Sequence, residues 1–168
     1  MQMFSSRATI RRKLKTSFTC YRSAQESGNN EFKILQWNCN GISRKVKELV
    51  EFMDKRGILT AELQETKPSS RNPLSCSSSY NVIRKYREIN KGGGIASLIH
   101  SSANFRPLDI QMDSIDDRFE IQGIAVRSAE VEIEIFNIHI LPMAACHSGY
   151  NPSLDFLLAG QNRIILGS

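Results

Sequence analysis

The chain contains 168 residues, of which 40% are hydrophobic and 23% are charged, a composition that indicates one globular domain and excludes a fibrous or disordered protein. Its net charge of +5 originates in residues 1 to 30, where six basic residues stand against one acid, so residues 31 to 168 hold 16 basic and 16 acidic residues. An overall basic field is therefore excluded for the folded part, and nucleic acid would have to bind in a local groove or at a metal ion.

Residues 1 to 31 are rich in Arg, Lys, Ser and Thr, with apolar residues such as Phe4, Ile10 and Leu14 between them. Three interpretations fit this composition: a disordered basic arm, a mitochondrial presequence at residues 1 to 30, or sequence that is not a natural part of the domain. We expect little fixed structure in this arm, and a domain that occupies residues 32 to 168.

A strand, a helix and a second strand are predicted next along the chain. Phe32 to Gln36 is a short apolar run that enters a turn rich in Asn and Gly. A helix of about 13 residues follows, because apolar residues recur at helical spacing until Gly57 stops the pattern. These apolar residues are Ile42, Val46, Leu49, Val50 and Met53. Ile58 to Gln64 is typical of a buried strand, so the Asn-Gly turn and Glu65 should lie at neighbouring carboxyl ends of a crossover unit, where open sheets usually carry their chemistry.

The remainder is predicted to be mainly strands. Thr66 to Ser79 contains six serines and two prolines without periodicity, which indicates a loop. Gly92 to Gly94 lacks the GxGxxG spacing and is expected to begin a strand rather than to cradle a nucleotide. The predicted strands are Asn81–Lys85, Gly94–His100, Phe119–Val126, Val131–Ile140 and Arg163–Leu166, and a helix is predicted at Asn151–Gly160. Val131–Ile140 should begin with one wet face and end buried on both.

The cysteines and the hydropathy pattern bear on the compartment. The four cysteines lie far apart without a pairing rhythm, which indicates a reduced, intracellular protein. The longest apolar runs are much shorter than the roughly 20 residues that cross a bilayer, so we expect no membrane partner.

Two short motifs could carry chemistry. LQWNCNG presents Asn38 and Asn40 just after a strand, and two carboxamides on one turn can hold a phosphate oxygen or orient a carboxylate. Alternatively, Asn and Gly there only make the turn. LQETK places Glu65 after an apolar strand, where one carboxylate suits Mg²⁺, although such an acid can also merely cap a turn. Trp37 is expected in the core rather than as a base-stacking platform.

Taken together, WNxNG, a helix, an apolar strand and QETK within about 35 residues resemble the endonuclease/exonuclease/phosphatase superfamily. Four later segments extend the likeness to the endonuclease domain of non-LTR retrotransposons, most closely the jockey-like group. They are GGGIASLIH (residues 92 to 100), FEIQGIAV (119 to 126), IEIFNIHILP (133 to 142) and RIILG (163 to 167).

The resemblance implies a fold, a cofactor and a set of site residues. The fold would be an α/β, DNase I-like four-layer sandwich of two mixed sheets flanked by helices. Asn38 matches the family's phosphate-site asparagine, Asn40 matches a following Asp or Asn that also serves the metal, and Glu65 matches the metal-binding glutamate. His139 stands at a catalytic position where the family generally has tyrosine, and Glu120 matches a common acid whose role the sequence does not explain. The implied cofactor is Mg²⁺, with Mn²⁺ as a substitute, and the implied partner is DNA.

The implied reaction is the nicking of DNA in the nucleus, which primes reverse transcription. In the relatives, RIILG is followed by an Asp-Phe-Asn segment and later by an Asp-His pair, whereas Ser168 is the last residue here. We therefore expect a truncated, inactive copy with one incompletely covered sheet. Two alternatives stay open: another phosphodiesterase or phosphatase of the superfamily, or a non-catalytic remnant that binds nucleic acid through residues 7 to 22.

Overall fold

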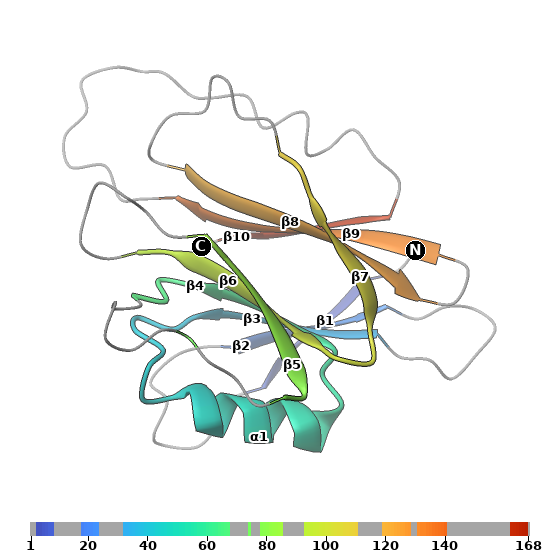
Figure 1. Cartoon of the computed structure of the whole chain (residues 1–168). Coiled ribbons are helices and arrows are strands. Elements are labelled where there is room, and N and C mark those ends of the chain that lie inside the picture. The colour runs from blue at the N-terminus through green and yellow to red at the C-terminus, as the bar shows by residue number, and fades with distance from the viewer. Residues whose placement is uncertain are drawn as a thin grey trace.

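The computed structural model describes residues 3–8, 18–23, 32–67, 74, 78–85, 93–110, 119–128, 131–140 and 162–167. These residues form ten strands and one helix. The strands make two mixed sheets that face each other, and the helix lies against the outer face of the larger sheet (Figure 1). The prediction of two mixed sheets is confirmed. The predicted helix at residues 151 to 160 and most of the predicted loop at 66 to 79 lie outside the described residues.

The larger sheet has six strands. In spatial order they are β1 (Met3–Ala8), β2 (Phe18–Ser23), β3 (Phe32–Asn38), β4 (Thr60–Gln64), β6 (Ile95–His100) and β5 (Tyr80–Lys85). All neighbours are antiparallel except β3 and β4, which run parallel and are connected through helix α1 (Val46–Arg56). The predicted crossover unit is confirmed, and it brings the ends of β3 and β4 to one rim of the sheet.

The first two strands correct the expectation of an unstructured arm. β1 and β2 form an antiparallel pair, and β2 continues the larger sheet by pairing along β3. The hydrophobic residues of these two strands do not recur at a regular spacing of two, so hydrophobic periodicity does not reveal the strands. A strand that adds to an existing sheet gains backbone hydrogen bonds whatever its side chains are.

The smaller sheet has four strands, in the order β10 (Arg163–Gly167), β9 (Val131–Ile140), β8 (Phe119–Ser128) and β7 (Asn104–Leu108). β9 and β10 are parallel, and the other pairs are antiparallel. β7 was not predicted, since it is short, half-exposed and contains Pro107; proline is tolerated there because β7 is an edge strand of this sheet within the described residues. β9 is partly exposed at its start and buried from Ile135 to His139, as predicted.

Helix α1 begins later than predicted, because residues 43 to 45 form a turn before it. It ends at Gly57, whose left-handed backbone (φ 61°) suits a residue without a side chain. Leu49, Val50 and Met53 form its buried face and pack in one cluster with the outer face of β3, β4 and β6. Trp37 is fully buried in this cluster, which confirms that it is a core residue. No helix among the described residues is long and apolar enough to span a bilayer.

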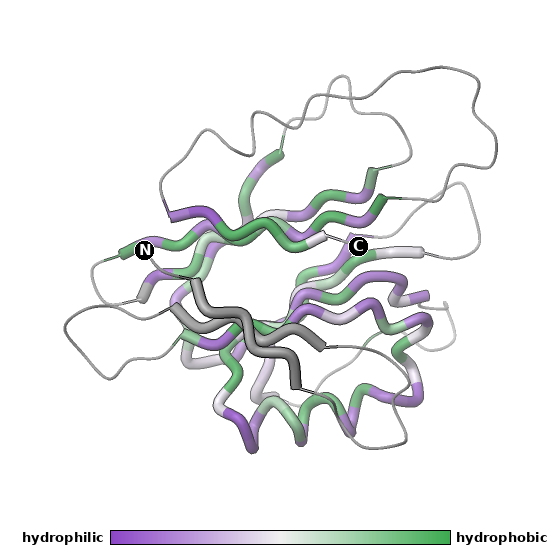
Figure 2. The backbone as a smooth tube through the Cα atoms, turned by 180° about the vertical axis from the view of Figure 1, so that it is seen from behind, coloured by the Kyte–Doolittle hydropathy of each residue, from purple (hydrophilic) through white to green (hydrophobic). Residues whose placement is uncertain are grey.

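The space between the sheets changes from apolar to polar toward the rim. At one end lies a cluster of aliphatic and aromatic side chains from both sheets, and Figure 2 shows hydrophobic stretches along both. Its buried members are Phe32, Ile34, Ile99, Ile124, Val126, Ile133, Ile135, Ile164 and Leu166. Along β4 and β9 the same faces then present Gln64 and Asn137, which are joined by a 2.7 Å hydrogen bond. The two sheets are therefore connected by directional polar contacts close to the rim that carries the candidate site.

Candidate functional site

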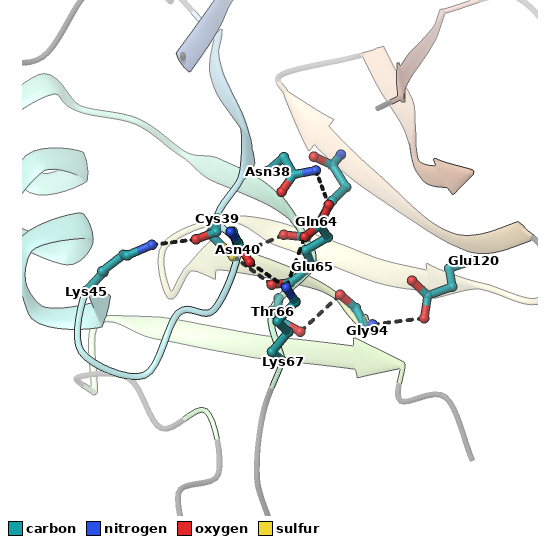
Figure 3. A network of polar contacts seen from close by, with 10 residues as sticks. All are labelled: Asn38, Cys39, Asn40, Lys45, Gln64, Glu65, Thr66, Lys67, Gly94 and Glu120. Carbon is teal, nitrogen blue, oxygen red and sulfur yellow. Dashed lines mark hydrogen bonds and ion pairs between the residues drawn. The ribbon is translucent and has the colours of Figure 1, made fainter. Parts of the chain in front are cut away.

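The two sequence motifs meet at the rim where β3 and β4 end. In the parallel register Asn38 is opposite Gln64, so Glu65 is the next residue beyond the pair. Asn38 Nδ2 donates a 2.8 Å hydrogen bond to Glu65 Oε1 (Figure 3). The carboxamide thus orients the carboxylate, which is one of the two roles that its position predicts.

The turn after β3 and the turn after β4 are held together by their backbones. Three successive hydrogen bonds join Cys39 N to Gln64 O (3.0 Å), Gly41 N to Glu65 O (2.8 Å) and Ile42 N to Thr66 O (3.1 Å). Asn40, Glu65 and Lys67 have positive φ values of 41°, 50° and 44°. Left-handed backbone is uncommon for Glu and Lys and costs roughly 1 kcal/mol or more per residue, so it persists where surrounding contacts impose it. The turns after β3 and β4 therefore form one specific structure, here called the frame, in which each turn depends on contacts with the other.

A third segment completes this frame. Thr66 N and Thr66 Oγ1 both donate to Gly94 O at 3.0 Å, and Lys67 N donates to Gly93 O at 2.8 Å. Both glycines have φ near 85° (85° and 86°), which glycine adopts without strain. β6 begins only at Ile95, so the glycines precede the strand rather than begin it. They hold the turn that bears Glu65.

Lys67 brings a positive charge between the two candidate ligands. Its Nζ donates a hydrogen bond to Asn40 Oδ1 and lies 3.4 Å from Glu65 Oε2. The pKa of Glu65 is held below its ordinary value, mainly by the hydrogen bond from Asn38 and also by Lys67 and His139, against the opposing effect of partial burial. Glu65 is accordingly a carboxylate at neutral pH. Asn40 and Glu65 present two oxygens to one cationic group.

The neighbouring cysteine is not a nucleophile. Cys39 Sγ lies 3.0 Å from Gln64 O, to which the thiol donates, and the side chain is fully buried. Burial raises the pKa of the thiol to about 12. Because the thiolate is the reactive form, a thiol with this pKa is inert at neutral pH.

A second lysine lies beside the same turn. Lys45 Nζ donates to Cys39 O at 2.5 Å (Figure 3). The same Nζ stands 5.4 Å from the centre of the Trp37 ring. The turn that bears Asn38 and Asn40 is therefore flanked by two ammonium groups, Lys45 and Lys67. Such a setting favours an anion such as a phosphate.

His139 occupies a different position from the other predicted residues. It lies on the inner face of β9, is 4% exposed, and is opposite Glu120 in the pairing of β8 with β9. Its effect on Glu65 is electrostatic, because it contributes to the lowered pKa of that carboxylate. The structure thus brings Asn38, Asn40 and Glu65 into one network on the larger sheet, whereas His139 belongs to the smaller sheet.

The donor set fits a hard divalent cation. Mg²⁺ is commonly held by one or two carboxylates, with water and substrate phosphate as the remaining ligands. Glu65 supplies the carboxylate, Asn40 supplies a neutral oxygen, and the Lys67 ammonium already occupies a cation-attracting position between them. Among the described residues no group of three or more His, Cys, Asp or Glu side chains could hold an ion. The described residues therefore do not form a closed cage of protein ligands around an ion.

The sequence did not indicate the roles of Lys67, Thr66 or the Gly93–Gly94 pair. Lys67 stands in the QETK motif, so its charge next to Glu65 was the available signal. The sequence does not explain a role for Glu120, and in the structure its Oε1 accepts a 2.9 Å hydrogen bond from Gly94 N (Figure 3).

Comparison with known proteins adds no family to these observations. No protein-family model matches the chain, and no curated protein sequence matches it at a significant level.

Proposed function

We propose that the rim formed by Asn38, Asn40 and Glu65 is the Mg²⁺- and phosphate-binding part of a phosphodiesterase site for DNA, as in non-LTR retrotransposon endonucleases. The observation that carries this proposal is the convergence of Asn40 and Glu65 on one cationic group, with Asn38 orienting the carboxylate. A structural turn has no need for two oxygens that face the same charge.

Each residue has a chemical part in this proposal. Glu65 and Asn40 would hold the ion, which when bound polarises a phosphate oxygen and stabilises the charge that develops in hydrolysis. Asn38 uses one N–H on Glu65 and has a second N–H that can donate to a phosphate oxygen. His139 lies on the second sheet and is the smallest of the causes that lower the pKa of Glu65.

The proposed fold is the four-layer sandwich, of which the described residues provide both sheets and one helical layer. The outer face of the smaller sheet supports a further layer. It bears the buried cluster of Ile121, Phe136 and Ile138, with Leu108, Ile110 and Phe119 packed against it. Ile140 and Ile165 remain 48% and 39% exposed. An apolar outer face of this kind requires a cover, and flanking helices supply one in a four-layer sandwich.

Direct metal binding tests the proposal. Mn²⁺ titrated into the chain and followed by electron paramagnetic resonance should bind at one site, and Glu65→Gln should weaken binding at least about tenfold, since it removes the ligand charge. Glu51→Gln, an exposed change on α1, is the matched control and should bind as the wild type does. Binding that is equal in the Glu65 and Glu51 variants would refute the proposal.

Substrate tests separate the rival functions. An inactive copy should leave supercoiled plasmid intact in the presence of Mg²⁺, and nicking that Glu65→Gln abolishes would overturn the expected inactivity. Mg²⁺-dependent phosphate release from a phosphoinositide would favour the phosphatase branch. For a remnant that binds nucleic acid through its arm, Gln at Arg11, Arg12 and Lys13 should abolish DNA binding and leave Mn²⁺ binding intact. Substitution is preferable to deletion, because β1 and β2 belong to the larger sheet.

A further inference from the structure

Glu120 reaches the candidate site from the other sheet. It lies on the inner face of β8 and is 6% exposed. Its Oε1 accepts a 2.9 Å hydrogen bond from the backbone N–H of Gly94, which precedes β6 in the larger sheet. This hydrogen bond fixes Gly94 against the second sheet.

Gly94 passes this constraint on to the turn that bears Glu65. Its N–H is held by Glu120, and its carbonyl accepts both hydrogen bonds from Thr66. Thr66 directly follows Glu65, which has a left-handed backbone that requires external contacts to persist. A continuous chain of described contacts therefore runs from Glu120 through Gly94 and Thr66 to Glu65.

We propose that Glu120 is a positioning residue of the metal site, because it holds the Gly93–Gly94 turn and thereby sets the backbone that aims Glu65. The inference depends on the proposed function for its metal part, while the holding of the turn stands on the contacts alone. In this proposal the smaller sheet helps to position a site whose candidate ligands all follow strands of the larger sheet. The plain alternative is that Glu120 only satisfies a buried amide and supports global stability.

Amide hydrogen exchange tests whether Glu120 holds the turn. Glu120→Ala should accelerate exchange at Gly94 and Thr66 at least about tenfold, because the Gly94 N–H loses its acceptor and the turn opens locally. Glu120→Gln keeps an acceptor oxygen and should stay near wild type. Glu120→Asp keeps the carboxylate but is one methylene shorter, so its exchange should resemble that of the alanine variant. If Glu120→Ala does not fold, Glu120→Asp serves in its place.

Gln122→Ala is the matched control for damage between the sheets. Gln122 lies two residues away on the same face of β8, and its Nε2 bonds to Ser97 Oγ at 2.6 Å rather than to the rim. It should lower global stability without selective exchange at Gly94 and Thr66. Equal exchange at these amides in the Glu120→Ala, Glu120→Asp and wild-type chains would overturn the positioning role.

Mn²⁺ titration tests the metal part. The alanine variant should bind Mn²⁺ roughly tenfold more weakly than the wild type, and the glutamine variant should remain within about threefold. Loss of affinity to the same extent in Gln122→Ala would reduce Glu120 to a structural residue and overturn the inference. A wild-type chain that binds no Mn²⁺ would overturn the proposed function and the metal part with it, and the exchange data would still decide the positioning part.

Discussion

Asn38 and Glu65 are 27 residues apart in the chain, and a 2.8 Å hydrogen bond joins Asn38 Nδ2 to Glu65 Oε1 at the shared rim of two parallel strands. The bond satisfies one carboxylate oxygen with a neutral donor. The other oxygen faces a cation, Lys67. Asn38 thus orients Glu65 through one carboxylate oxygen, and the second oxygen interacts with a positive charge.

Asn38→Ala should raise the pKa of Glu65 toward its ordinary value, because the hydrogen bond from Asn38 is the largest cause of the lowered pKa. A carboxyl with a lowered folded-state pKa contributes stability above its unfolded pKa and loses it as the pH falls through the folded value. The variant should therefore show less acid-dependent loss of stability below about pH 4.5. Carbon-13 NMR titration of the Glu65 carboxyl measures the shift. Asn81→Ala, exposed on β5, is the control and should leave this pKa unchanged.

Local patterns were sufficient for the crossover unit and for the convergence of its two motifs. The two apolar runs, the helical spacing between them and the stop at Gly57 predict β3, α1 and β4. Because β3 and β4 are parallel neighbours, Asn38 and Glu65 lie at one edge of the sheet. The apolar periodicity begins before the helix does, because Ile42 is buried from the segment that precedes the turn at residues 43 to 45.

The remaining features depend on contacts between distant segments. β1 and β2 have no hydrophobic alternation and join the sheet through the edge of β3. The bond from Gly94 to Glu120 links residues 26 positions apart in different sheets, and such a contact leaves no periodic trace in the sequence. Sequence could identify the acid, and the structure was needed to give it a partner.

Lys67→Met should tighten Mn²⁺ binding. The Lys67 ammonium contacts both Asn40 Oδ1 and Glu65 Oε2, so it competes with a metal for the same oxygens. An exposed ion pair is worth up to about 1 kcal/mol, so its loss should improve affinity about two- to fivefold. Mn²⁺ titration at constant ionic strength measures this, with Lys55→Met in the last turn of α1 as the control. Weaker binding in Lys67→Met would instead show that the lysine helps to assemble the site.

Glu62 should make stability fall as the pH rises. Its side chain is buried between the sheets, where Ser97 Oγ donates to Glu62 Oε2 at 2.5 Å, and burial raises its pKa to about 8 despite that bond. The folded chain then keeps a proton that the unfolded chain releases above about pH 4.5. The stability from this group is complete below that pH and is lost progressively up to about pH 8.

Glu62→Gln should remove this dependence, because the amide is neutral at every pH and still offers an oxygen to Ser97. The difference in unfolding free energy from the wild type should be small near pH 5 and favour the variant by on the order of a few kcal/mol near pH 8. The titratable groups on the facing strands, Glu120 on β8 and His139 on β9, are present in both chains and cancel in this difference. Urea unfolding at both pH values provides the measurement, and a difference that does not change with pH would contradict the assignment.

Gly123→Ala should destabilise the smaller sheet. A Cβ at this position would stand 3.1 Å from Leu108 Cβ and 3.2 Å from Ile110 Cδ1, closer than side chains normally pack. Leu108 Cβ is fixed by the backbone of β7, so relief requires that strand to shift, at a cost of about 1 to 2 kcal/mol. Gly167→Ala is the matched control, since its nearest neighbour would be Ile138 O at an ordinary 3.9 Å. Denaturant midpoints compare the two variants, and equal midpoints would show that β7 yields without cost and that Gly123 does not fix its approach to β8.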